Sequence, residues 1–226
     1  MGLLNTLKWR IREHPTLYPA LQRLRGESWG TFCNADTDFC IEGYQSSSNS
    51  FVYNVFCLLA PELHIGHHTH SVANLKRAVQ YGVPTLVLYR KPADCIPSLV
   101  SRFRPSLEDG VVRYARFYQY VLDHVDAFVL ASFEETTQHI ASTIKRVEAN
   151  TSFDFGPYDA DSVAEEAVTH IRAWTKEQGD EDRISLPKAQ RNTQKEALRK
   201  KLRTLTLFAE AEQVYDQLEQ HFRSPA

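Results

Sequence analysis

The chain has 226 residues, of which 42% are hydrophobic, and a formal net charge of −2 at pH 7. This length and apolar content suffice for one α/β core, and the near-neutral charge argues against a nucleic-acid-binding protein. No apolar run approaches the length of about 18 residues that a membrane-spanning helix needs, and we expect no signal peptide. Four cysteines without a C-x-x-C spacing predict reduced thiols and a cytoplasmic protein.

The first 34 residues are predicted to form a helical arm. Apolar and basic residues are mixed along it, and Pro15 and Pro19 interrupt the pattern. We expect residues 1–34 to pack as an N-terminal arm on a domain that spans residues 35–226. A segment that lies on a membrane surface is the alternative.

An apolar strand, a run of small polar residues and an apolar helix follow one another over residues 39–51. Backbone N–H groups in the first turn of a helix have no intrahelical partner and lie at the positive end of the helix dipole. Small side chains let a phosphate approach these groups, so we predict an anion-binding loop formed by Gln45, Ser46, Ser47, Ser48, Asn49 and Ser50. An ordinary helix cap is the alternative. The loop lacks the G-x-x-x-x-G-K-[ST] pattern, which disfavours an ATP or GTP hydrolase.

Histidines are concentrated in residues 64–70, which we expect to follow a short apolar strand. Imidazole is the commonest metal ligand, so a metal site is one interpretation. The segment contains no H-E-x-x-H, however, and neighbouring side chains beside a strand point to opposite faces. We therefore expect no metal here.

A second phosphate-binding segment is predicted in residues 84–98. A strand of the buried type ends at Arg90, and Ser98 lies one or two turns into the next helix. An arginine at the end of a strand and a serine on the following helix can clamp a phosphate through a bidentate fork and a hydroxyl. The alternative is a structural ion pair between Arg90 and Asp94.

The rest of the chain predicts helices and one more strand. The strand is expected over residues 127–131, and hydrophobic periodicity predicts helices over 107–124, 134–150, 161–178, 188–203 and 205–222. The aromatic stripe in residues 113–120 is expected to lie in the core. Strands that alternate with helices predict an α/β fold with a parallel sheet covered on both faces, and a ligand beyond the carboxyl ends of the strands.

Taken together, these segments resemble the nucleotide-binding motifs of the sulfotransferases, and in particular a bacterial sulfotransferase-like group. The family's 5′-phosphosulfate-binding loop is matched by Tyr44, Ser47, Asn49, Ser50 and Phe51. Its 3′-phosphate-binding motif is matched by Arg90, Pro92, Asp94 and Ser98. The triplet His68-Thr69-His70 is similar to the family's K-x-H, with histidine in place of lysine. The resemblance runs from about residue 35 to near the C-terminus.

The resemblance implies a P-loop-type three-layer fold and transfer of a sulfuryl group from 3′-phosphoadenosine 5′-phosphosulfate, without a metal. The acceptor would be a hydroxyl or amine of a small molecule, carbohydrate or lipid. His70 would remove the acceptor proton. The loop would hold the sulfate end, and the 3′-phosphate would be bound by Arg90, Ser98 and the late basic residues Arg191 and Lys195.

One position departs from the family. A proline and then a lysine or arginine are expected where this chain has Gln45 and Ser46. In the family that cation neutralises the oxygen from which the sulfuryl group leaves, so here His68, or an arginine from elsewhere, is expected to supply the charge. A non-catalytic phosphonucleotide-binding protein and a kinase-like phosphoryl transferase are the alternatives.

Overall fold

The computed structural model describes residues 3–26, 30–177 and 192–223. The strands are β1 (Phe39–Gly43), β2 (Ile65–His67), β3 (Thr85–Tyr89) and β4 (Val129–Ser132). The helices before β4 are α1 (Leu3–Arg12), α2 (Leu17–Leu24), α3 (Asn49–Leu59), α4 (Val72–Tyr81), α5 (Pro92–Phe103), α6 (Leu107–Asp123) and the 3-10 turn η1 (Val125–Ala127). After β4 come α7 (Phe133–Gln138), α8 (Ile140–Asn150), α9 (Ala160–Glu177), α10 (Asn192–Leu202) and α11 (Phe208–Arg223).

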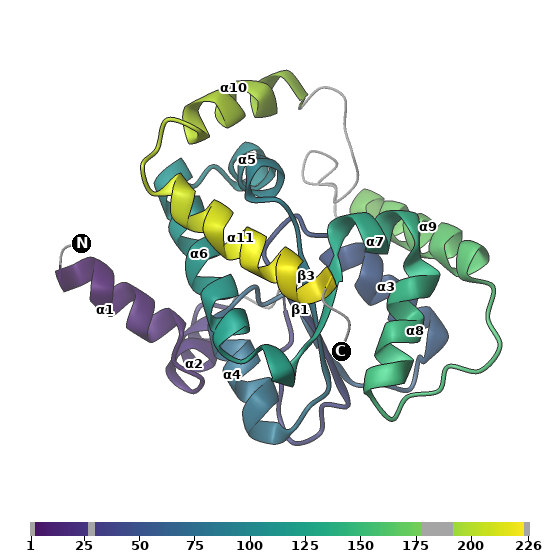
Figure 1. Ribbon diagram of the computed structural model, residues 1–226. Helices are drawn as coiled ribbons and strands as arrows, with labels where there is room; N and C mark the ends of the chain where they lie inside the picture. The colour runs from purple at the N-terminus through teal and green to yellow at the C-terminus, as the bar shows by residue number, and fades with distance from the viewer. Residues whose placement is uncertain (1–2, 27–29, 178–191, 224–226) are drawn as a thin grey trace.

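The four strands form a parallel sheet in the order β2-β1-β3-β4, and the inner strands β1 and β3 are labelled in Figure 1. Strand β1 lies in the middle, with β2 on one side and β3 on the other, so the chain reverses its direction of winding there. In open α/β sheets this reversal leaves a crevice at the carboxyl ends of the strands, where ligands bind. The predicted α/β fold with a parallel sheet between helical layers is confirmed.

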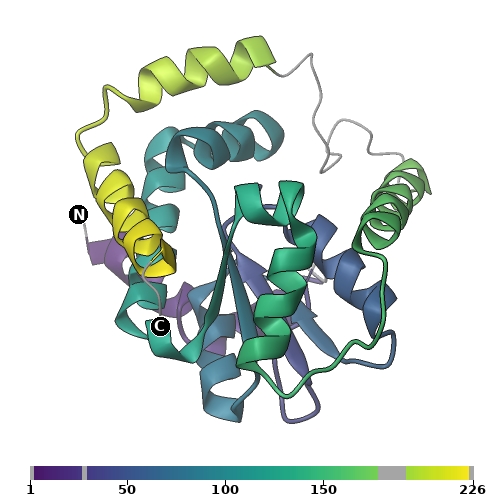
Figure 2. The ribbon, with the colours of Figure 1, turned by 45° about the vertical axis from the view of Figure 1, so that its right-hand side comes forward.

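Alternate residues of the strands enter two separate cores. Leu86 and Leu88 of β3 face α3, α8 and α9 on one side of the sheet, where Phe39 joins them. Val87 and Tyr89 face α4, α5, α6 and α11 on the other side. Figure 2 shows the sheet between these two groups of helices. Because both faces are covered, every residue of β1 and β3 is buried, rather than every second one.

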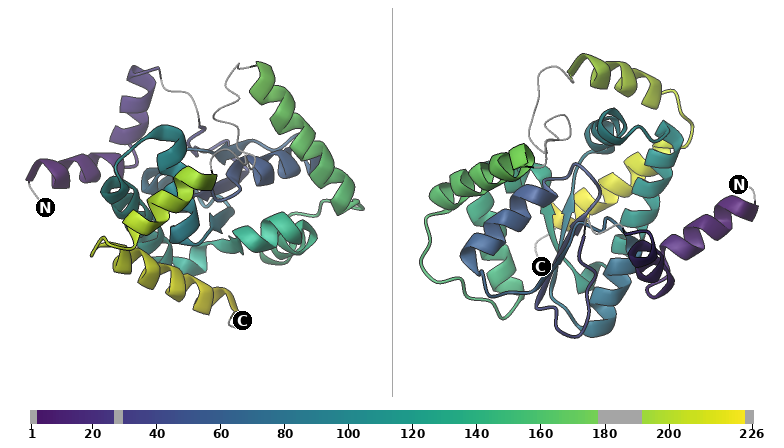
Figure 3. Two further views of the ribbon diagram at one scale, coloured as in Figure 1. Left: turned by 90° about the horizontal axis from the view of Figure 1, so that it is seen from above. Right: turned by 180° about the vertical axis from the view of Figure 1, so that it is seen from behind.

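The N-terminal helices lie at one edge of the molecule, and α1 projects away from the sheet (Figure 3). They are joined to α6 through Arg116, whose guanidinium binds Glu13, and through an ion pair of 3.0 Å between Lys8 and Asp109. Trp9 is buried at this contact. The boundary at residue 34 stays a prediction. Within the described residues, no helix combines the length and apolar character needed to cross a lipid bilayer.

Two sequence predictions about element bounds are wrong. The histidine segment does not follow a strand: β2 itself runs from Ile65 to His67 and pairs with β1. The single helix predicted over residues 134–150 is two helices, separated at His139, where φ is −143°. The hydroxyls of Thr136 and Thr137 both donate to the Phe133 carbonyl oxygen, and such local bonds compete with the helical ladder.

Candidate functional site

The carboxyl ends of all four strands meet at one edge of the sheet, and the predicted motifs follow them. The serine-rich loop leaves β1 after Gly43, and the histidine segment begins in β2. Arg90 follows β3 directly. At Gly43 a Cβ atom would lie 2.4 Å from the Leu88 carbonyl oxygen, so the close approach of β1 to β3 requires glycine. The structure thus brings together three segments that are far apart in sequence.

The backbone of the serine-rich loop contains two residues with left-handed geometry. Ser46 has φ 68° and Ser48 has φ 66°, both in the left-handed region. Alternating right- and left-handed residues before a helix form a concave nest of N–H groups that binds anions. The Asn49 amide closes the loop by donating to the Tyr44 carbonyl oxygen at 2.9 Å. Strained backbone of this kind is typical of functional sites.

Several loop side chains support the loop or its neighbours. The Ser48 hydroxyl lies 2.5 Å from the Ser47 carbonyl oxygen and 2.8 Å from the Thr136 hydroxyl of α7. The Ser50 hydroxyl lies 3.0 Å from Nε2 of His68. Ser47 is fully buried, whereas Gln45 is half-buried. The main chain of the loop is therefore better placed than its hydroxyls to supply most of the donors for an anion.

Two arginines converge on Ser46. Nη1 of Arg90 donates to the Ser46 carbonyl oxygen at 2.8 Å, and its guanidinium lies 3.7 Å from the centre of the Phe133 ring. Nε of Arg90 is buried and has no hydrogen-bond partner among the described residues. Arg102, in the last turn of α5, has Nη1 3.5 Å from the Ser46 hydroxyl oxygen. Two positive groups therefore flank a loop position that itself has no charge.

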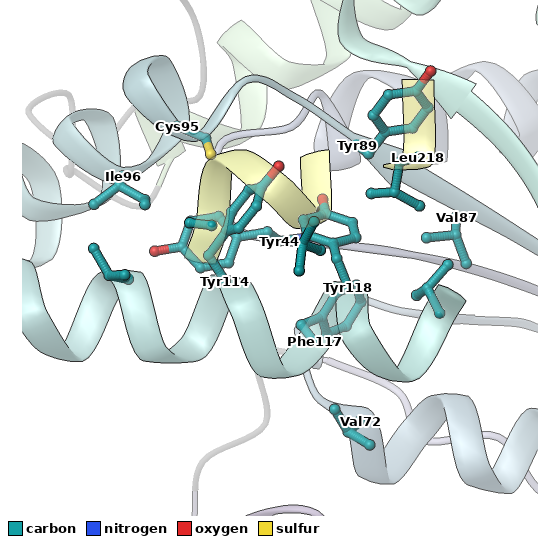
Figure 4. Packing of buried hydrophobic residues seen from close by; sticks show 14 of the residues in the cluster. Tyr44, Val72, Val87, Tyr89, Cys95, Ile96, Tyr114, Phe117, Tyr118 and Leu218 are labelled. Carbon is teal, nitrogen blue, oxygen red and sulfur yellow. Dashed lines mark hydrogen bonds between the residues drawn. The ribbon is translucent and has the colours of Figure 1, made fainter. Parts of the chain in front are cut away.

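The aromatic stripe of α6 contacts the start of both predicted phosphate motifs, and Figure 4 shows Tyr114 and Tyr118 packed beside Tyr44. The Tyr118 hydroxyl donates to the Leu88 carbonyl oxygen at 2.7 Å and accepts from the Tyr44 N–H at 3.1 Å. The Tyr114 hydroxyl donates to the Arg90 carbonyl oxygen at 2.8 Å. Tyr114, Phe117 and Tyr118 are fully or almost fully buried, which confirms the expected core position of the stripe. The Tyr118 and Tyr114 hydroxyls therefore also fix the backbone at the start of the loop and at Arg90.

His70 is held as a neutral imidazole with a defined tautomer. Its Nδ1 lies 2.7 Å from the Gly43 carbonyl oxygen, which can only accept, so the proton sits on Nδ1 and Nε2 has a free lone pair. Burial lowers the pKa of His70, the Glu42 carboxylate and the Gly43 bond oppose this, and the positive charge of Arg102 lowers it further. A neutral imidazole with an available Nε2 is suited to act as a general base.

The imidazoles of His67 and His68 form a pair beside the loop. Their Nδ1 atoms are 2.6 Å apart, and the His67 ring stacks on Tyr53 with centroids 3.9 Å apart. Burial, with the nearby His70, lowers the pKa of His67 to about 4. Burial, with both neighbouring imidazoles, also lowers the pKa of His68 well below its ordinary value. This pKa direction favours a neutral His68 near pH 7 and therefore favours an arginine as the source of the positive charge.

Glu42 organises the histidine segment from within the sheet. It is fully buried on β1, and its carboxylate accepts from the Thr69 N–H, the Thr69 hydroxyl, the His70 N–H and the Asn74 amide at 2.6–3.0 Å. A buried carboxylate is stable only when its oxygens are satisfied in this way. Glu42 thus sets the position of His70, whose own φ is 49°.

The predicted 3′-phosphate motif lies along the amino-terminal half of α5. Ser98 is nearly buried, two turns into that helix. The structure pairs Asp94 with Arg199 of α10 at 2.6 Å rather than with Arg90. Lys195 lies one turn earlier on α10, the helix that this ion pair joins to α5. Arg191 lies outside the described residues.

A small cavity of about 30 Å³ lies beside His70. The N-terminal helices contribute Trp9 and Arg12 to its wall, and α6 contributes Arg113 and Arg116. Separately, the described part of the chain contains no group of three or more His, Cys, Asp or Glu side chains arranged to hold a metal ion.

Two functional candidates were missed in the sequence. Arg102 lies four residues after Ser98, so helical spacing places both on one face of α5, and this signal was available. Glu42 gave no such signal, because a single glutamate in an apolar strand does not reveal which donors will surround it.

No protein-family model and no curated protein matches the chain. Among solved structures, the chain is similar to mouse sulfotransferase SULT7A1 complexed with PAP, at 11% sequence identity and a TM-score of 0.48. The similarity covers 84% of this chain and 91% of that chain.

Proposed function

We propose that the protein is a sulfotransferase that uses 3′-phosphoadenosine 5′-phosphosulfate as its donor. The observation on which this depends most is the convergence of Arg90 and Arg102 on Ser46, with the neutral His70 bonded to Gly43 at the start of the loop. A nest of N–H groups flanked by guanidinium groups fits a phosphosulfate, and a base beside it fits an acceptor hydroxyl or amine.

Each residue of the site then has a defined task. The loop N–H groups orient the 5′ end of the nucleotide, and Nε2 of His70 accepts the proton of the acceptor. Arg90 and Ser98 bind the 3′-phosphate, with Lys195 and Arg191 from the late basic segment. Nε of Arg90 is buried and makes no hydrogen bond within the described part of the chain, so it can donate to such an oxygen.

The acceptor approaches from the side of the cavity beside His70. Because Trp9 and Arg12 of the N-terminal arm line this cavity, the arm takes part in choosing the acceptor. The four cysteines are free, which supports a reducing, cytoplasmic compartment.

Nucleotide binding tests the proposal. Calorimetry should show tighter binding of 3′-phosphoadenosine 5′-phosphate than of AMP or ATP, with no requirement for Mg²⁺. Arg90→Ala should lose about 1.5–3 kcal/mol of binding free energy for the 3′-phosphorylated nucleotide, because a charge-assisted contact is lost, and much less for AMP.

A Mg²⁺-dependent preference for ATP would favour a kinase-like phosphoryl transferase instead. Tight binding of the 3′-phosphorylated nucleotide without sulfate transfer to any acceptor tried would favour the non-catalytic protein. Equal losses for both nucleotides in Arg90→Ala would remove Arg90 from the 3′ site.

A further inference from the structure

We propose that Arg102 is the cation that neutralises the 5′-phosphate as the sulfuryl group leaves. This inference rests on the proposed function. It assigns the positive charge to a residue of α5, because the serine-rich loop has no basic residue. Between Tyr44 and Tyr53 the chain contains no lysine or arginine. A charge at this point must therefore come from another element.

The position of Arg102 matches that task. Its Nη1 is 3.5 Å from the Ser46 hydroxyl oxygen. The guanidinium therefore lies beside the position where the family's loop has a lysine or arginine. This contact is at the outer limit of hydrogen-bond distance, so it fixes where the guanidinium lies without occupying it strongly. Arg102 is half-buried, which limits screening of its charge by solvent.

Arg102 also lies close to the base. Its charge lowers the pKa of His70, which together with the Ser46 contact places cation, loop and imidazole in one site. The other candidate from the sequence, His68, is neutral because burial lowers its pKa. Arg90 is already engaged by the Ser46 carbonyl oxygen and by the Phe133 ring.

The transfer step balances with these groups. The acceptor oxygen or nitrogen forms a bond to sulfur, and the bond from sulfur to the bridging oxygen breaks. That electron pair stays on the 5′-phosphate, whose added negative charge Arg102 offsets, and the acceptor proton goes to Nε2 of His70. A charge directed at the developing anion stabilises the transition state more than the ground state.

The central test compares Arg102→Ala with Arg104→Ala, which removes an exposed arginine two residues further along. With saturating donor, Arg102→Ala should lower kcat by about 10²- to 10³-fold. It should also weaken binding of 3′-phosphoadenosine 5′-phosphate but not of adenosine 3′-phosphate, which has no 5′-phosphate. Arg104→Ala should match the wild type in all three measurements, and Arg102→Lys should recover part of the loss.

A charge transplant sharpens the test. In the double variant Ser46→Lys with Arg102→Ala, the cation is placed on the loop, so kcat and affinity should return towards wild type. A double variant no better than Arg102→Ala, together with equal losses for both nucleotides in Arg102→Ala, would overturn the proposal.

Two further measurements separate this inference from the proposed function. If the wild type prefers the 3′-phosphorylated nucleotide and Arg102→Ala binds and turns over normally, Arg102 is not the cation although the function stands. If the wild type has no such preference, the proposed function fails. NMR titration of His70 needs no ligand: its pKa should rise in Arg102→Ala, and an unchanged pKa would contradict the placement of Arg102.

Discussion

The two ends of the proposed nucleotide site are held by different kinds of contact. At the 5′ end, Ser46, Ser48 and His70 have left-handed backbone, and the buried Glu42 collects four hydrogen bonds. At the 3′ end, an ion pair between Asp94 and Arg199 ties α10 to α5, with side chains 31% and 29% exposed.

This difference corresponds to what each end must do. Strained backbone persists only where surrounding contacts fix it, and such fixed geometry is what transfer between bound groups requires. A partly exposed ion pair is weak and lets a segment adjust. We infer that the 5′ end is built for chemistry and the 3′ end for binding, and the following variants test that contrast.

The largest expected effect is on the rate. His70→Ala should lower turnover by about 10²- to 10⁴-fold while leaving affinity for 3′-phosphoadenosine 5′-phosphate nearly unchanged, because a general base acts on the acceptor. The measurement is sulfate transfer with saturating donor. His64→Ala, which removes an exposed histidine of the same segment, is the control. An active His70→Ala beside an inactive His68→Ala would show that the base is His68.

Glu42→Ala should lower the free energy of unfolding by about 2–4 kcal/mol, because it leaves several buried donors without an acceptor. Urea denaturation measures the loss, and Glu62→Ala, on the exposed loop before β2, should change it little. A loss as small as that of the control would mean that the 5′ end is not fixed from within the sheet.

Acid should weaken the same end of the site. His67 has an ordinary pKa of 6.5 when unfolded and about 4 when folded, with His68 and His70 as its titratable neighbours. The unfolded chain therefore binds more protons between these values, and stability should fall by up to about 3 kcal/mol as the pH drops through this range. Urea denaturation at several pH values should show this slope, and His67→Gln should flatten it. An unchanged slope would contradict the assignment.

The smallest effect is expected at the 3′ end. Asp94→Asn should cost less than about 1 kcal/mol of stability, because the ion pair with Arg199 is partly exposed. Affinity for the 3′-phosphorylated nucleotide should fall only a few-fold as α10 loosens. Asp126→Asn serves as the exposed control. A loss as large as that of Glu42→Ala would remove the contrast between the two ends.

The arrangement of strands, loop and helices could be predicted because it depends on local patterns. Apolar runs of strand length, the serines before α3 and the arginine after β3 are all readable within short windows. Parallel strands then bring their carboxyl ends to one edge. The bounds of the helices and strands were harder to predict. The break at His139, for example, depends on hydroxyl contacts within α7 rather than on hydrophobic periodicity.

The parts of the site that escaped prediction depend on contacts between remote residues. Arg102 and Ser46 are far apart in the chain, as are Asp94 and Arg199, and no local pattern specifies that they meet. The neutrality of His68 also follows from burial, which only the folded structure reveals. Roles for His70 and Arg90 came from the motif resemblance and stay proposals until variants are measured.

Through the hydroxyls of Tyr114 and Tyr118, α6 supports the backbone of both the loop and Arg90. A local opening of α6 would release both motifs at once, so a molecule with α6 open cannot hold the nucleotide. Bound nucleotide should therefore suppress such openings by mass action. Hydrogen–deuterium exchange of the α6 amides should slow on addition of 3′-phosphoadenosine 5′-phosphate, which makes α6 a reporter of occupancy in the neighbouring site.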